Sequence, residues 1–306
     1  MIVEATLFVA GLAALVFGAD RAVTAAAEVA RFYGVSEFFI GVTLISVGTS
    51  LPEMTTSIVA ASYGAGDIVV GNIVGSETSQ ITLAIGIVAL ITPIVAKRRE
   101  VMVYGGAMTL AMIIMLLTLE DGVVQRSEGF LMMLAYVNFV YTLYTNEGGA
   151  EIAEEVVEEE ETPERGLPRV VFGLLLVVVG GQVMVTNGIE LARLVGISEY
   201  FVGLLTGLGT TAPEIVVAGI AAKEGRGGIS VGAILGSNIT DPVFSLGIGA
   251  LVADVVVTDL ASVTLSGVYM LAVSLVVLAL FYWREGIDRR AALVCIGLYL
   301  PTFVVL

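Results

Sequence analysis

Histidine is absent from this 306-residue chain, and cysteine occurs once, at Cys295. A lone cysteine cannot form an internal disulfide, and a chain without histidine cannot build a metal site on imidazole. Basic residues are scarce too: 14 Lys and Arg stand against 29 Asp and Glu, for a net charge of −15. No basic patch is present, which excludes nucleic acid as a partner.

Polar residues are sparse over most of the chain, which is 57% hydrophobic with a mean hydropathy of +0.98. A membrane-spanning helix needs about 20 mostly apolar residues. Ten such stretches occur, at 5–29, 37–61, 68–95, 100–118, 124–144, 168–192, 198–221, 228–252, 259–282 and 288–306. Transmembrane β-strands would alternate in segments of about ten residues. The sequence therefore predicts an all-α integral membrane protein with ten spans. Its start lacks a basic region and a cleavage site, so we expect a first span and not a signal peptide.

Much of the negative charge lies in one segment, Thr145–Gly166, which holds nine Glu and one Arg. Dense like charge with Pro and Gly is typical of a solvated linker, although a role in gathering cations stays open. The linker separates five spans from five. The predicted division is a first repeat at 1–144, a linker at 145–167 and a second repeat at 168–306.

The two halves resemble each other. The segment Gly18–Gly41 aligns with Gly180–Gly203, and "VGNIVGSETSQ" aligns with "VGAILGSNITD". Such self-similarity indicates an internal duplication. Within the first span, Asp20 and Arg21 align with Gln182 and Val183, so we expect them to serve local structure or gate contacts.

An odd number of spans per repeat makes the second repeat enter the membrane from the opposite side. Inverted repeats with broken helices are typical of secondary transporters. Lys and Arg accumulate in cytoplasmic loops. If the loops between the ten spans are numbered one to nine, these residues concentrate in the odd-numbered loops, whereas the even-numbered loops hold only Arg126 and Arg193. We therefore expect a cytoplasmic linker and two external termini.

A duplicated phrase interrupts two of the spans, as "GTSLPE" up to Glu53 and as "GTTAPE" up to Glu214. Pro52 and Pro213 lack a backbone N–H and leave earlier carbonyls unpaired. A carboxylate at membrane depth is expensive and suggests function. No Lys or Arg in these spans is available to neutralise the two glutamates.

Further oxygen-bearing side chains lie at helical spacing around these acids: Thr49, Ser50, Thr210, Thr211, Ser76, Gln80, Ser237 and Asp241. Taken one at a time, small hydroxyl residues also serve simply to pack membrane helices. Together they predict a cage of oxygen ligands at the centre of the membrane. Such a cage favours hard cations, Ca²⁺ or Na⁺, over Zn²⁺ or Cu²⁺.

These motifs resemble the α-repeats of the sodium/calcium exchanger family, within the cation/Ca²⁺ antiporter superfamily, and are most similar to its small prokaryotic members. The matching segments are 41–80 and 203–241. The resemblance implies ten helices in two inverted repeats, a site between spans two, three, seven and eight, and a sliding gate of spans one and six. It implies a monomer in the prokaryotic cell membrane that exchanges Ca²⁺ for Na⁺, with no cofactor and no enzymatic activity.

By motif position, the resemblance makes Glu53 and Glu214 the main ligands of both ions. It gives Thr49, Ser50, Thr210 and Thr211 supporting roles through hydroxyls or carbonyls, and Ser76 and Ser237 roles at flanking Na⁺ sites. The backbone carbonyls of Ser46 and Gly207 match further Na⁺ ligands. Asp241 matches a family position held by Asp or Asn.

The chain departs from the family pattern at Glu77, where the family has Asn, and at Gln80, one methylene longer than the usual Asn. Glu77 either adds charge to the site or pairs with a helix N-terminus or a polar neighbour. Buried acids also leave H⁺/Ca²⁺ exchange open as the alternative function, since desolvation favours protonated carboxyls. An intramembrane aspartyl protease would need two facing aspartates, which the pattern does not offer, and acidic traps in inverted halves favour a transporter over a channel.

Overall fold

The computed structural model describes residues 1–96, 98–147, 166–194 and 211–302. The first half contains, in chain order, α1 (Ile2–Tyr33), α2 (Glu37–Ile40), the π-helix η1 (Gly41–Ile45), α3 (Ser46–Thr49), α4 (Leu51–Ser62), α5 (Gly66–Ser79), η2 (Gln80–Ala84), α6 (Ile85–Ile91), β1 (Ile94–Val95), α7 (Arg98–Thr118), β2 (Val123–Val124) and α8 (Arg126–Glu147). The second contains α9 (Gly166–Leu194), α11 (Ala212–Lys223), α12 (Gly227–Thr240), η4 (Asp241–Ser245), α13 (Leu246–Val252), β3 (Val255–Val256), α14 (Leu260–Arg284), β4 (Gly286–Ile287) and α15 (Arg289–Tyr299). The prediction of an all-α protein is confirmed.

Within the described ranges, six helices are long and apolar enough to cross a membrane, or seven if the bent pair Glu37–Thr49 and Leu51–Ser62 forms one span. The count of ten spans therefore stays a prediction. Two of the six, Gly66–Ile91 and Gly227–Val252, are 78% and 89% buried over their most apolar window. The others are at most 39% buried, so these two form the centre of the bundle and the rest surround it.

The two halves repeat the same succession of elements. The helices α4 and α11 are each 12 residues long, α5 and α12 are each 14, η2 and η4 are each five, and α6 and α13 are each seven. Each of these elements in the second half begins 161 residues after its counterpart. The internal duplication read from the sequence thus extends to the bounds of the helices.

Two small antiparallel strand pairs show how the halves are related. Strand β1 pairs with β4, and β2 pairs with β3. By position in the repeat, β3 corresponds to β1 and β4 corresponds to β2. A rotation that exchanges the halves therefore converts one pair into the other. If the connections between the ten predicted spans are numbered in chain order, β1 and β4 lie in odd-numbered connections and β2 and β3 in even-numbered ones. Odd-numbered and even-numbered connections lie at opposite ends of the bundle. The rotation therefore also exchanges the two ends, as inverted repeats require.

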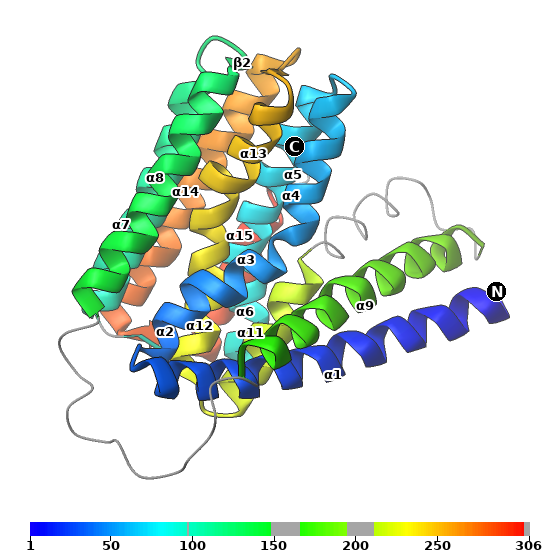
Figure 1. The fold of residues 1–306 in the computed structure, drawn as a ribbon, viewed down its shortest axis with the longest axis vertical. Coiled ribbons are helices and arrows are strands. Elements are labelled where there is room, and N and C mark those ends of the chain that lie inside the picture. Colours follow the sequence, from blue (N-terminus) through cyan, green and yellow to red (C-terminus); the bar gives the residue numbers. More distant parts are fainter. Residues whose placement is uncertain (97, 148–165, 195–210, 303–306) are drawn as a thin grey trace.

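The helices α1 and α9 lie side by side and run across the other helices at a steep angle (Figure 1). Glycines bring their backbones together: a Cβ on Gly11 would lie 2.8 Å from the carbonyl oxygen of Gly180, and one on Gly18 would lie 2.7 Å from that of Gly173. The opposite order of these contacts along the two helices makes the pair antiparallel. Small residues at such contacts let membrane helices approach closely.

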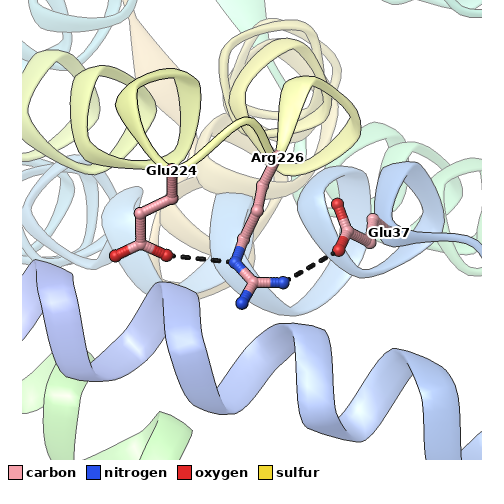
Figure 2. A network of polar contacts seen from close by, with 3 residues as sticks. All are labelled: Glu37, Glu224 and Arg226. Carbon is pink, nitrogen blue, oxygen red and sulfur yellow. Dashed lines mark hydrogen bonds and ion pairs between the residues drawn. The ribbon is translucent and has the colours of Figure 1, made fainter.

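An ion-pair network joins the halves at the end predicted to be cytoplasmic. Arg226, the residue before α12, contacts Glu37 Oε1 at 3.1 Å through Nη1 and Glu224 Oε2 at 3.0 Å through Nε, as Figure 2 shows. Glu37 begins α2 in the first half. The repeat counterpart of Arg226 is Ala65, so this pairing has no equivalent at the opposite end of the bundle.

The pair between Arg226 and Glu37 is partly exposed, with side chains 23% and 35% accessible. We expect a double-mutant cycle with Arg226→Met and Glu37→Gln to give a coupling of about 0.5 kcal/mol, because solvent screens such pairs. Thermal unfolding of the purified protein in detergent, at low and high salt, measures it. The coupling should shrink at high salt; additive effects of the two substitutions would show that the contact contributes nothing.

Candidate functional site

The second span is interrupted at Ser50, between α3 and α4, where the backbone has φ −77° and ψ 2°. The helices on its two sides are bent by 44°. Pro52 is the second residue of α4 and cannot donate to the carbonyl of Gly48. Helix α11 begins in the same way, with Thr211 before it and Pro213 as its second residue. The helix break predicted at Pro52 is confirmed.

Glu53 and Glu214 are the third residues of α4 and α11, and both side chains are completely buried. Neither oxygen of either carboxylate makes a hydrogen bond of normal geometry with the described residues, although the side chain of Thr49 interacts with Glu214. The two groups repel each other electrostatically. The positive ends of two helix dipoles favour negative charge here, but they do not replace hydrogen bonds or a counter-ion. The arrangement is therefore stable only when the two groups bind a cation or take up protons.

Hydroxyl groups connect the second span with α12. The Oγ1 of Thr49 lies 3.3 Å from the Oγ of Ser237, and the Oγ of Ser46 lies 3.4 Å from the Oγ1 of Thr240. Gly236 makes this approach possible, since a Cβ at this position would lie 2.6 Å from the Cα of Val42. Predicted site residues from opposite halves of the chain are thus brought into contact.

The third span meets α11 in a corresponding way, through a hydrogen bond between the hydroxyls of Ser79 and Thr211. The Oγ of Ser76 donates instead to the carbonyl of Ile73 in its own helix, at 3.1 Å. Ser50 Oγ is buried without a hydrogen bond of normal geometry, and its side chain interacts with Asp241. Hydroxyl groups of the third span, of Ser50 and of Thr211 are therefore buried in this region together with the two glutamates.

A chain of side-chain amides crosses the centre between the halves. Asn238 Nδ2 donates to Gln80 Oε1 at 2.8 Å, and Gln80 Nε2 donates to Asp241 Oδ2 at 3.3 Å. Ser245 Oγ donates to the other oxygen of Asp241 at 2.9 Å. Gln80 and Asp241 are the first residues of the π-helices η2 and η4, a backbone form frequent at functional sites.

Glu77 is a further buried carboxylate in this region. Its side chain is fully buried, and neither oxygen has a hydrogen-bond partner in the described part of the chain. It interacts electrostatically with Asp241 and Glu53. Pairing with a helix N-terminus or a polar neighbour finds no hydrogen bond in the described residues, and the contribution of Glu77 to the site stays a prediction.

All the predicted site residues in the described ranges are buried: Ser46, Thr49, Ser50, Glu53, Ser76, Glu77, Gln80, Thr211, Glu214, Ser237 and Asp241. Gly207 and Thr210 lie outside the described residues. Within those residues, no group of three or more Asp, Glu, Cys or His side chains is close enough to hold a metal ion. A cation bound here therefore needs hydroxyl, amide or backbone oxygens as well as carboxylates.

Sequence reasoning missed several members of this network: Ser79, Tyr136, Asn238, Thr240 and Ser245. A signal existed for some of them. Asn238 is the repeat counterpart of Glu77, and Ser79 and Thr240 stand three residues after the predicted serines. Tyr136, whose hydroxyl accepts a hydrogen bond from Thr240 at 3.2 Å, lies on α8 without any motif around it.

Broken helices and inverted halves around a buried charged centre are the architecture of secondary transporters. The sequence model described as sodium/calcium exchanger protein matches residues 3–145 and 167–306. The chain belongs to the sodium/calcium exchanger family.

Individual relatives agree with this membership. Inner membrane protein YrbG of Escherichia coli is 33% identical over 94% of this chain and 90% of its own length. Sodium/calcium exchanger MaX1 of Methanosarcina acetivorans is 29% identical over 97% and 96%. A solved structure of the sodium-calcium exchanger NCX_Mj has a TM-score of 0.83 at 28% identity, covering 99% of this chain and 98% of that one.

We expect Gly236→Ala to weaken ion binding, because its Cβ would lie 2.8 Å from that of Ser46 and would push apart the helices whose hydroxyls meet. Overpacking of this kind costs about 1–3 kcal/mol, which corresponds to about five- to 150-fold weaker apparent Ca²⁺ affinity when the bound state bears the whole cost. Equilibrium ⁴⁵Ca²⁺ binding measures it. Gly106→Ala, on the exposed face of α7 with no atom within 4 Å, is the matched control. Equal affinities in the two variants would contradict the account.

Proposed function

We propose that the chain is a secondary antiporter that exchanges Ca²⁺ for Na⁺ across the membrane by alternating access. The observation that carries the proposal is the pair of completely buried glutamates, each at the start of a helix behind a proline, with no hydrogen bond among the described residues. Membership of the family and the names of MaX1 and NCX_Mj support the choice of ions. Transport of ions, without covalent chemistry, accounts for a site made of oxygen ligands.

In this proposal Glu53 and Glu214 are the principal ligands of both ions. The oxygens of Thr49, Ser50, Thr210, Thr211, Ser76, Ser237 and Asp241, with the carbonyls of Ser46 and Gly207, complete the coordination. The side-chain oxygen of Gln80 accepts a hydrogen bond from Asn238, and its nitrogen donates one to Asp241. We infer that Gln80 shapes the site, and that the second lone pair of its side-chain oxygen remains available to an ion. Glu77 adds negative charge beside Asp241.

The exchange follows from electrostatics. One Ca²⁺ or several Na⁺ can each neutralise the same carboxylates, but the two loads cannot occupy them together. An empty site leaves uncompensated charge in a medium of low dielectric, where isolated charges are costly. Loaded forms therefore change conformation readily and the empty form does not, which is the condition for obligatory exchange.

We further propose that the protein acts as a monomer in the prokaryotic cell membrane, with the linker cytoplasmic and both termini external. The contacts between connections support two distinct ends. Arg98 pairs with Glu285, and Arg169 with Glu28, all at or next to odd-numbered connections. The backbone N–H of Arg126 donates to Asp254 at 3.0 Å between even-numbered ones.

We predict that Glu53→Gln and Glu214→Gln each reduce Na⁺-driven ⁴⁵Ca²⁺ uptake into proteoliposomes by about two to three orders of magnitude or more. Removing one partner of a buried charge interaction costs about 3–5 kcal/mol, and 1.4 kcal/mol is tenfold. The exposed Glu120→Gln is the control and should match the wild type.

The same vesicles distinguish the coupling ion when an outward H⁺ gradient replaces the Na⁺ gradient. Uptake driven only by the H⁺ gradient would show that the coupling ion is H⁺ and not Na⁺. Absence of uptake under both gradients, with folded protein, would overturn the assignment of Ca²⁺ as substrate.

The orientation is tested at the two ends of α7. In a Cys295→Ala background, an impermeant maleimide applied to intact cells should label Glu120→Cys and leave Arg99→Cys unlabelled until the membrane is opened. Both positions are exposed in the fold, so burial does not limit the reaction. The reverse pattern would place the linker outside.

A further inference from the structure

A groove lies on the outer surface of the bundle, between α1 and α9, and none of the predicted site residues lines it. It has a volume of about 310 Å³ and is lined by Phe17, Arg21, Pro168, Arg169 and Phe172. The two phenylalanines are 49% and 58% exposed. An apolar groove on a membrane helix pair contacts lipid by default, but this one also carries two guanidinium groups.

The charge of this groove is unbalanced. The guanidinium of Arg21 lies over the ring of Phe17, 4.9 Å from its centroid, and forms no ion pair with the described residues. Arg169 uses Nη1 to bind Glu28, which leaves other N–H donors of its five free. Asp20 precedes Arg21 in the chain but does not line the groove. Glu28 offsets the charge of Arg169, so the uncompensated positive charge of the groove is that of Arg21, with the remaining donors of Arg169 beside it.

The groove lies near the end of the bundle predicted to be cytoplasmic. Arg169 is in the first turn of α9, directly after the linker. Phe17 and Arg21 line the same groove as Arg169, so they lie near this end as well. Arginine side chains at this depth reach toward lipid headgroups, and an unpaired one within hydrocarbon is expensive.

The internal repeat shows that packing does not require these charges. Gly18 of α1 corresponds to Gly180 of α9, an offset of 162 residues. At that offset the counterparts of the five lining residues are Val179, Val183, Thr6, Leu7 and Ala10. The equivalent surface at the other end of the helix pair therefore carries neither arginine nor phenylalanine, although the glycine contacts between the helices are the same.

We propose that this groove binds an anionic phospholipid of the cytoplasmic leaflet. Arg21 and Arg169 contact the headgroup phosphate, and Phe17 and Phe172 contact the acyl chains. Each basic residue at the membrane surface strengthens the binding of anionic lipid by about a factor of five. Because the groove is formed by both helices, one bound lipid bridges α1 and α9.

The test is native mass spectrometry of the full-length protein, supplied with phosphatidylglycerol or with phosphatidylcholine. Phosphatidylglycerol should be retained preferentially, and Arg21→Gln should lower its occupancy about fivefold. Arg99→Gln removes an exposed arginine at the same end of the bundle but outside the groove, and it should leave occupancy unchanged. Arg21→Lys keeps the charge and should retain most of the binding, which separates loss of charge from loss of fold.

Equal occupancy in the wild type and Arg21→Gln, or no preference for phosphatidylglycerol, would overturn the proposal. Displacement of the lipid by excess inorganic phosphate would do the same, since it would identify a free anion as the ligand. The readout is bound lipid, so its outcome is independent of whether the chain exchanges Ca²⁺ for Na⁺.

Discussion

The structure depends on two carboxylates that are buried without compensation. Glu53 and Glu214 have no hydrogen bond and no basic neighbour in the described part of the chain, and a lone charge in this environment is among the most costly features a fold can carry. Other features follow from it. The prolines place each glutamate in the first turn of a helix, where the dipole is favourable. The hydroxyls of two neighbouring spans then approach the same point.

The duplicated chain solves a geometric problem. A single broken helix supplies one carboxylate and a few oxygens from one side, whereas two inverted copies surround the centre. The exchanged strand pairs, β1 with β4 and β2 with β3, and the antiparallel glycine contacts between α1 and α9 both express this relation. The symmetry is broken at the centre, where the repeat counterpart of Glu77 is Asn238, and at the surface, where those of Arg226 and Arg21 are Ala65 and Val183.

Much of this was accessible from sequence, because membrane helices and their breaks leave strong local signals. Long apolar runs predict most of the helices, and a proline followed by a glutamate predicts the helix break at Ser50. The cross-chain contacts were not accessible. Helical spacing places Gln80 and Asp241 on their own helices, but it does not show that Asn238 bridges to Gln80 or that Tyr136 reaches Thr240. The π-helices begin at Gln80 and Asp241 with no shared residue pattern to announce them, since Pro242 occurs in only one.

The measurement that tests the central claim most directly is equilibrium binding of ⁴⁵Ca²⁺ to the purified protein during a titration with Na⁺, with choline as the ionic-strength control. If both ions neutralise Glu53 and Glu214, Na⁺ displaces Ca²⁺ completely, choline does not, and Glu53→Gln loses the Na⁺-sensitive binding. Ca²⁺ that stays bound at saturating Na⁺ would show that the two ions occupy separate sites, and the account of exchange at one pair of carboxylates would fail.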